Sequence, residues 1–229
     1  MNSTELPAYI VLFALVSLAW LWFFSGKADR LRPATLIGVF VAGLLSGPII
    51  GLLSGALQGA LVASHTSGAL FSREFLIQFL IVGPGEEIAK FLAVLAAGLR
   101  RLDFQTSTDG IVLGVAAALG FACGENVLYM LVYGPELTLP RLVLGNLGHA
   151  AFALFWGYAL GAVLHEGAPL SLLLVGLTLA AFFHGSYNYL LGAGSGGGAM
   201  LAFALFAVLT GALFYALGAE RERNRERRR

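Results

Sequence analysis

The feature that most constrains this fold is a succession of long apolar runs, separated by short breaks that are charged or rich in turn residues. A helix rises about 1.5 Å per residue, so a run of roughly 20 residues crosses the hydrocarbon core of a bilayer. Hydrophobic residues make up 58% of the 229 residues and charged residues 12%, far from the balance of soluble proteins. The sequence therefore predicts an all-α fold, a polytopic membrane helical bundle.

Seven runs are long enough to span a membrane, and residues 1–229 are predicted to form one integral membrane domain. The predicted spans are 7–24, 34–62, 75–99, 110–133, 141–164, 170–191 and 199–218. The first run lacks the basic leader of a secretory signal, so we interpret it as a retained span. If it were only interfacial, six spans would remain and the amino terminus would face the cytoplasm.

Cations gather in alternate loops, and this segregation predicts the orientation. Lys27, Arg30 and Arg32 follow the first span, and arginines fill the basic tail 219–229. Because positive loops stay in the cytoplasm, we expect the amino terminus outside and the carboxyl terminus inside the cell. The preference for arginine over lysine favours a prokaryotic plasma membrane. No basic patch is interleaved with aromatic residues, so nucleic acid is not an expected partner.

The third predicted span contains two carboxylates and an ammonium, at Glu86, Glu87 and Lys90. Glu86 lies about 16 Å along the helix from Phe75, near the middle of the bilayer. Each charge at that depth costs on the order of 2.5 to 3.5 kcal/mol, and ionisable residues within spans usually mark functional sites. A structural ion pair with Lys90 is sterically available, but it leaves the second carboxylate unexplained.

Three later spans carry polar residues at a similar depth. Glu125 and Asn126 lie about 12 Å from the predicted outer end of the fourth span, and His149 lies about 12 Å from that of the fifth. In the sixth span, His184 and Asn188 lie about 10 and 5 Å from the outer end. Antiparallel helices would therefore bring these side chains and the acids of the third span into one layer, in the outer half of the membrane.

Carboxylates and imidazoles in a confined polar cavity are groups that perform general acid–base catalysis on water. Glu86 is the predicted base that activates water, and Glu87 has a supporting role. His184 and Asn188 are expected to hold the water or to stabilise the oxyanion that forms when a peptide carbonyl is attacked. The other predicted members of the cavity are Glu125, His149 and, as supporting residues, Lys90 and Asn126.

A metal centre is the alternative for the same residues. His149, His184 and Glu125 would supply the two imidazoles and one carboxylate of a catalytic zinc site. These ligands come from separate predicted helices, and the sequence has no HExxH motif, so their spacing does not support zinc. We therefore favour a site without a cofactor and keep zinc as the alternative.

Several other small or polar residues are expected to be structural. The second span has glycine at every fourth position from Gly43 to Gly59, a pattern that lets another helix approach closely. Asp103 and Asp109 are expected to cap the fourth span. The loop residues expected to be solvated are His65, His165 and Glu166.

At these positions the sequence resembles the PrsW family of intramembrane proteases, within the group that includes the type II CAAX prenyl endopeptidases. The matching motifs are EExxK at 86–90, Asp109-Gly110 followed by GFAxxEN at 120–126, Arg141 with His149, and HGxxN at 184–188. The resemblance implies a helical membrane protease that cuts a single-span or membrane-tethered protein. In bacterial members it implies a first cut of an anti-sigma factor on the outer side. The active-site positions that it implies are Glu86, Glu87, Glu125, His149, His184 and Asn188.

Two other functions are compatible with buried polar residues. A proton-coupled transporter would use Glu and His as relay groups, but the inner parts of two spans, at 111–119 and 152–163, are almost purely apolar. A non-catalytic membrane scaffold, as occurs in the wider group, would keep the polar cluster without turnover. The sequence favours the protease and leaves the oligomeric state open.

Overall fold

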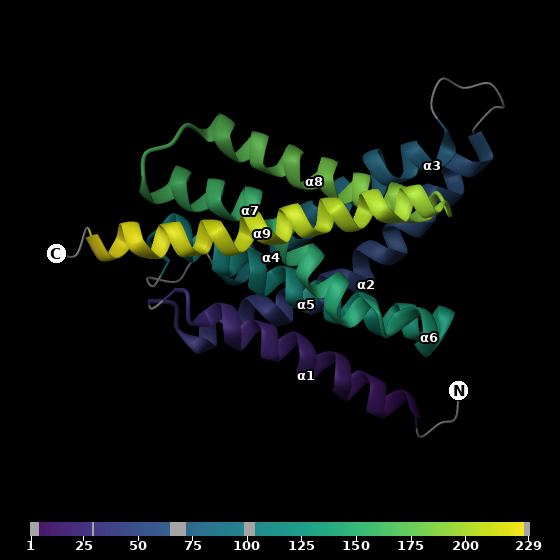
Figure 1. Ribbon diagram of the computed structural model, residues 1–229, viewed down its shortest axis with the longest axis horizontal. Helices are drawn as coiled ribbons and strands as arrows, with labels where there is room; N and C mark the ends of the chain where they lie inside the picture. Colours follow the sequence, from purple (N-terminus) through teal and green to yellow (C-terminus); the bar gives the residue numbers. More distant parts are fainter. Residues whose placement is uncertain (1–4, 29, 65–71, 99–103, 227–229) are drawn as a thin grey trace.

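The computed structural model describes residues 5–28, 30–64, 72–98 and 104–226. Within these residues the secondary structure is helical and contains no strand, which confirms the predicted all-α class. The first turn of α1 and the last turns of α9 lie at opposite ends of the longest axis (Figure 1). The elements are α1 (Glu5–Ser25), α2 (Pro33–Ser64), α3 (Arg73–Leu76), the π-helix η1 (Ile77–Val82), α4 (Gly83–Ala97), α5 (Ser107–Tyr133), α6 (Pro135–Thr138), α7 (Arg141–His165), α8 (Leu170–Gly192) and α9 (Gly196–Glu226).

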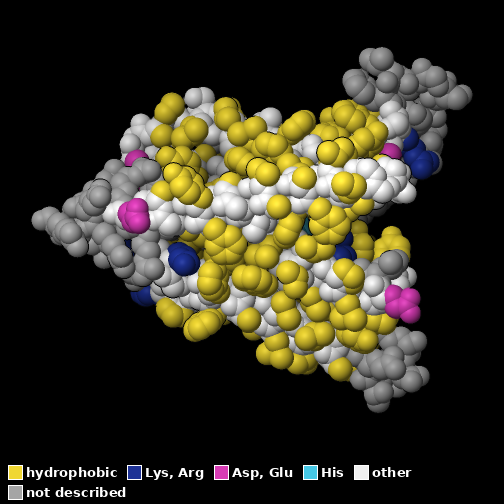
Figure 2. All heavy atoms as spheres, viewed as in Figure 1, with side chains coloured by type: hydrophobic (Ala, Val, Ile, Leu, Met, Phe, Trp, Pro, Cys, Tyr) yellow, Lys and Arg dark blue, Asp and Glu magenta, His cyan; other side chains and the backbone are white. Residues whose placement is uncertain are grey.

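Among the described residues, six helices are long and apolar enough to cross a membrane, namely α1, α2, α5, α7, α8 and α9. They coincide with six of the seven predicted spans. Figure 2 shows hydrophobic side chains over the middle of one face, whereas most of the visible charged side chains lie toward the two ends. The chain is therefore an integral membrane protein. Helix α9 continues past the predicted end of its span, through the basic tail to Glu226.

The third predicted span is interrupted. Its described residues lie in α3, η1 and α4, so a π-helical segment separates two α-helical ones. Pro84 explains the interruption, because it has no amide hydrogen and its ring would clash with the carbonyl group four residues earlier. The Gly83 N–H donates instead to the carbonyl of Gln78, five residues before it, and the helix continues with a wider turn. The predicted end of this span, Leu99, lies outside the described residues.

Helices α5 and α7 form the centre of the bundle. Their membrane-spanning windows are 83% and 78% buried, whereas those of the other four long helices are 17% to 28% buried. Glycine allows the two central helices to touch at Gly110 and Gly157. A Cβ atom on Gly110 would come within 2.3 Å of the Gly157 carbonyl oxygen, so a larger residue there would force the helices apart.

The glycine ladder of α2 has two parts. A Cβ atom on Gly43 would lie 2.2 Å from the carbonyl oxygen of Ala117 in α5, and one on Gly47 would lie 3.2 Å from that of Phe121. At Gly55 and Gly59 an added Cβ would meet no described atom within 4 Å. The first part therefore packs α2 against α5 of the same chain, and the second part does not.

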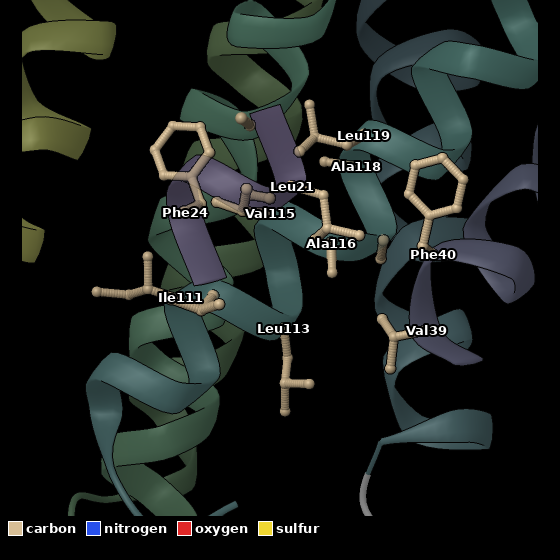
Figure 3. Close-up of a cluster of buried hydrophobic side chains, with 14 of the residues drawn as sticks. Leu21, Phe24, Val39, Phe40, Ile111, Leu113, Val115, Ala116, Ala118 and Leu119 are labelled. Atoms are coloured by element: carbon tan, nitrogen blue, oxygen red, sulfur yellow. The ribbon is translucent and has the colours of Figure 1, made fainter. Parts of the chain in front are cut away.

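Helix α1 belongs to the bundle. Its Leu21 and Phe24 are buried in the apolar core, where Figure 3 shows them beside side chains of α5 such as Val115 and Ala116. Burial of apolar side chains stabilises such a contact mainly through packing, because lipid tails are themselves apolar. This contact supports the interpretation of the first run as a membrane span.

Asp109 takes part in capping α5, although the N-cap residue is Thr106. The Thr106 hydroxyl accepts a hydrogen bond from the Asp109 N–H at 3.1 Å, and the Asp109 carboxylate accepts one from the Gln105 N–H at 3.0 Å. These bonds satisfy backbone donors that a helix start leaves unpaired. Asp103, the other expected cap, lies outside the described residues.

The expectation that Glu166 is only solvated was wrong. Its Oε1 atom accepts hydrogen bonds from the backbone N–H and the hydroxyl of Ser107, at 3.0 and 2.6 Å, and so ties the end of α7 to the start of α5. His165 is exposed, with its ring edge-on to Phe104 at 4.8 Å between centroids. His65 lies outside the described residues.

Candidate active site

Close contact between α4 and α8 brings the acids of α4 to the centre of the bundle. A Cβ atom on Gly83 would lie 2.6 Å from the Ala181 carbonyl oxygen, and one on Gly185 would lie 2.8 Å from the Gln78 carbonyl oxygen. Glycine at both positions therefore allows the two helices to approach more closely than they could with larger side chains. It places α4 directly beside His184, which immediately precedes Gly185.

Both oxygens of Glu87 are engaged. Within the described structure, Oε1 accepts hydrogen bonds from Lys90 Nζ at 2.6 Å and from His184 Nδ1 at 2.9 Å, and Oε2 accepts one from Trp156 Nε1 at 3.0 Å. Glu87 and Lys90 are both fully buried, so these donors replace the hydration that the charges have lost. With Nδ1–H donating to Glu87, neutral His184 has an acceptor at Nε2.

Glu86 differs from Glu87 in its hydrogen bonding. Its Oε2 atom is buried and makes no hydrogen bond to any residue that the structure describes. His184 Nε2 lies 3.5 Å from this atom, and Lys90 Nζ lies 4.0 Å from it. Glu86 therefore presents a carboxylate oxygen that can still accept a proton, a hydrogen bond or a ligand.

A second cluster of charged and polar residues surrounds Glu125. Its Oε2 atom lies 2.7 Å from Arg141 Nη2 and 2.9 Å from His149 Nε2. The Arg141 guanidinium also lies 3.7 Å above the Tyr129 ring, and its Nε atom is 3.4 Å from Asn126 Oδ1. Glu125 is thus neutralised by a cation whose own position is fixed by an aromatic ring and an amide.

His149 connects the two groups. Its Nδ1 atom lies 2.8 Å from Lys90 Nζ, while its Nε2 atom faces Glu125. Since an ammonium can only donate, Nδ1 accepts from Lys90 and Nε2–H donates to Glu125. Lys90 therefore bridges Glu87 and His149, and it also lies 4.6 Å from the centroid of the Phe121 ring.

Two cavities meet at this cluster. The larger, of about 880 Å³, lies between α2 and α5 and reaches α3, η1 and α4, where Glu86 forms part of its wall. The smaller, of about 240 Å³, lies between α7, α8 and α9, where His149 and His184 form part of its wall. Four residues line both cavities: Glu125, Arg141, Asn188 and Leu191.

Every residue of the predicted site lies in or beside this cluster. Direct contacts join Glu86, Glu87, Lys90, Glu125, Asn126, His149 and His184, and Asn188 lines both cavities next to them. Two participants were not assigned to the site. Trp156 looked like an ordinary core residue, and Arg141 was named with His149 among the family motifs but was given no role.

Three of these side chains together form a possible set of metal ligands. Glu86, His149 and His184 each offer one ligand atom, and these atoms lie within 4.8 Å of one another. This differs from the predicted set, in which Glu125 was the carboxylate, because Arg141 holds Glu125. Two imidazoles and a carboxylate are typical zinc ligands, and the bond from His184 to Glu87 is the usual support for a ligating histidine. The residues therefore fit a metal ion by donor type, and His149 would have to release one of its two partners.

The fold and this site define a class, an integral membrane helical protein with a buried centre of carboxylates and imidazoles suited to hydrolysis. Comparison with known proteins identifies the family. The family described as "PrsW family intramembrane metalloprotease" matches residues 32–219. The chain therefore belongs to the PrsW family of intramembrane proteases, as its motifs indicated.

Curated relatives support this assignment. The chain is 32% identical over 193 residues to Protease PrsW of Shouchella clausii, which covers 83% of this chain and 84% of the relative. It is 31% identical over 156 residues to Protease PrsW of Halalkalibacterium halodurans, covering 68% and 71%. It is 33% identical over 119 residues to Protease PrsW of Bacillus subtilis, which covers 51% of this chain and 55% of the relative. No solved structure matches the chain.

Proposed function

We propose that the protein hydrolyses a peptide bond of a membrane-tethered protein where the two cavities meet, and that Glu86 takes the proton of the attacking water. The observation that carries this proposal is the contrast among the three glutamates. Glu87 is saturated by donors and Glu125 is paired with Arg141 and His149, whereas Glu86 Oε2 has no hydrogen-bond partner among the described residues. A general base needs such an available oxygen within reach of the water.

The surrounding residues support the reaction in distinct ways. The acceptor Nε2 of His184 would hold the second hydrogen of the water, while Glu87 fixes the imidazole through Nδ1. The hydroxide adds to the carbonyl carbon as Glu86 accepts the first proton, and the carbonyl oxygen becomes an oxyanion. Asn188 and Arg141, which line both cavities, would stabilise that oxyanion. Glu86 then returns its proton to the leaving amine as the carbon–nitrogen bond breaks.

The larger cavity suits an unwound stretch of substrate. A peptide bond inside a helix is shielded by its own hydrogen bonds, so a cut requires local extension. An extended segment exposes N–H and C=O groups that must be satisfied within the membrane. The cavity wall offers polar partners for them at Ser54, Gln58, Glu74 and Gln78. With the predicted orientation, this cavity opens in the outer half of the membrane, which favours the first cut of a single-span anti-sigma factor.

A metal-dependent version is the second candidate. The observation that favours it is the grouping of Glu86, His149 and His184, together with the description of the family as metalloproteases. When bound, a zinc ion would polarise the carbonyl group and lower the pKa of water. We favour Glu86 as the base because both nitrogens of His149 are already engaged, one of them by the Lys90 ammonium, whose charge opposes a nearby cation.

The decisive experiment compares variants of the purified full-length protein on single-span membrane proteins. We expect Glu86→Gln to lower the cleavage rate by roughly 10²-fold or more, the range for loss of a general base. His184→Ala should have a similar effect, and Glu136→Gln, which changes an exposed acid of α6, should have none. Cleavage that survives both site changes would end the assignment. If the wild type cut no substrate, a scaffold with this fold would be favoured instead.

A further inference from the structure

The smaller cavity has an apolar body and a polar base. Its walls away from the charged cluster are formed by side chains such as Leu144, Phe152, Tyr187 and Phe203. At its base lie His149 and His184, whose rings are 5.1 Å apart between centroids. An apolar cavity that also contains polar groups is the usual form of a pocket that orients a ligand.

We infer that this smaller cavity is a specificity pocket for one large apolar side chain of the substrate, adjacent to the bond that is cut. The inference rests on the proposed function and adds the substrate preference to it. Glu86 reaches the cluster from the larger cavity, and the two histidines reach it from the smaller one. A carbonyl group held between them therefore has one neighbouring side chain that can point into each cavity, because successive side chains of an extended strand point in opposite directions.

The size and shape of the pocket favour a leucine or an aromatic side chain. Its volume of about 240 Å³ is far larger than a methyl group needs. Two glycines of α7, Gly145 and Gly148, leave part of this space open. A Cβ atom on Gly148 would meet only the rings of Phe152 and Phe206, at about 3.9 Å, which is ordinary van der Waals contact. Glycine at 148 is therefore not demanded by close helix packing, unlike Gly110 or Gly43, and its effect is to keep the pocket deep.

Two substitutions change the pocket in opposite directions. Gly148→Leu would fill it from α7, and Phe203→Ala would widen it from α9, where the Phe203 side chain is 51% exposed and contributes little to the core. The matched controls are Gly211→Leu, at a position with no described atom within 4 Å of an added Cβ, and Leu201→Ala, which is 60% exposed. Neither control residue lines the pocket.

The test uses single-span reporter proteins whose cut site has been mapped with the wild type. Alanine, leucine, phenylalanine or tryptophan is placed on either side of the cut bond, and kcat/KM is measured for each reporter. We expect the wild type to prefer leucine or phenylalanine over alanine at one of the two positions by roughly 10-fold or more, as in other apolar pockets. Gly148→Leu should reverse this order in favour of alanine, and Phe203→Ala should raise the relative rate for tryptophan.

The outcomes separate this inference from the function on which it rests. Equal rates for all reporters, or an order that neither pocket variant alters, would overturn the specificity pocket and leave the protease intact. Absence of cleavage of every reporter by the wild type would instead overturn the proposed function, and the pocket with it. If Gly148→Leu lowers the rate for all reporters equally, that variant alone does not test the pocket. Phe203→Ala then does so, because a wider pocket must change the order in which the reporters are preferred.

Discussion

The indole Nε1 of Trp156 donates a hydrogen bond to Oε2 of Glu87 at 3.0 Å, although 69 residues separate them in the sequence. This bond fixes the carboxylate on the side opposite to Lys90 and His184. Trp156→Phe would keep an aromatic ring beside Phe91 but would remove the donor. We expect the free energy of unfolding to fall by about 1–3 kcal/mol, because a buried acceptor would lose its partner.

The unfolding temperature can be measured through the reactivity of Cys123. It is the single cysteine of the chain and is buried, so its alkylation during heating in detergent reports unfolding. Trp22→Phe is the control, since Trp22 is 79% exposed. An unfolding temperature for Trp156→Phe equal to that of the control would show that the bond contributes nothing.

Glu87→Gln should damage the fold as well as activity. The substitution leaves the buried Lys90 ammonium without its ionised partner at 2.6 Å, and removal of one member of a buried pair typically costs about 3–5 kcal/mol. Glu86→Gln should cost far less stability, because the Oε2 atom of Glu86 has no hydrogen-bond partner among the described residues. The Cys123 assay compares both variants, and equal unfolding temperatures would contradict the distinction between the two glutamates.

The pair formed by Arg141 and Glu125 should behave as one unit in catalysis. Arg141→Lys would keep the charge but lose the planar group that contacts Glu125 and covers the Tyr129 ring. In a double-mutant cycle of Arg141→Lys and Glu125→Gln on kcat/KM, we expect a coupling energy of about 0.5–3 kcal/mol. Strictly additive effects would mean that the two residues act independently.

Chelation distinguishes the two proposed chemistries. If Glu86 acts as the base, cleavage by the purified protein should persist after treatment with a zinc chelator, and elemental analysis should find zinc well below one per chain. Stoichiometric zinc that is lost together with activity, and lost again in His184→Ala, would instead make Glu86 a metal ligand beside His149 and His184.

The two parts of the α2 glycine ladder should respond differently to a single methyl group. Gly43→Ala would place a Cβ atom 2.2 Å from the Ala117 carbonyl oxygen, and we expect a loss of about 1–3 kcal/mol from overpacking. Gly59→Ala, where no described atom lies within 4 Å of the added Cβ, should leave the unfolding temperature within error of the wild type. Equal effects at the two positions would show that α2 is not held against α5 in this way.

Much of this arrangement was predictable, because membrane helices constrain depth so strongly. Counting residues along antiparallel spans placed Glu86, Glu125, His149 and His184 at similar levels, and the structure brings them together. Depth alone, however, does not determine which side chain faces which. The bond from Trp156 to Glu87 depends on the rotation of α7 about its own axis, for which a nearly all-apolar helix gives no periodic signal.

The π-helical interruption at η1 also could not be predicted from the periodicity of the sequence. The segment 77–82 is apolar except for Gln78, and its pattern does not distinguish an α-helix from a π-helix. Only Pro84, at the start of α4, indicated a break, and a proline does not specify a π-helix before it. The contact of Glu166 with Ser107 was equally unpredictable from local sequence, because it joins segments that are 59 residues apart.

The wider turn at η1 determines which side chains the larger cavity can display. Glu74, Gln78, Val82 and Glu86 all line that cavity, at intervals of four residues. In a continuous α-helix each such step advances about 40° beyond a full turn, so Glu86 would face about 120° away from Glu74. The π-helical stretch has more residues per turn, so it offsets this drift and keeps these four side chains in one row along the cavity wall. Removing a single residue from η1 would therefore rotate Glu74 and Gln78 away from the larger cavity, even if every other contact of α4 were preserved.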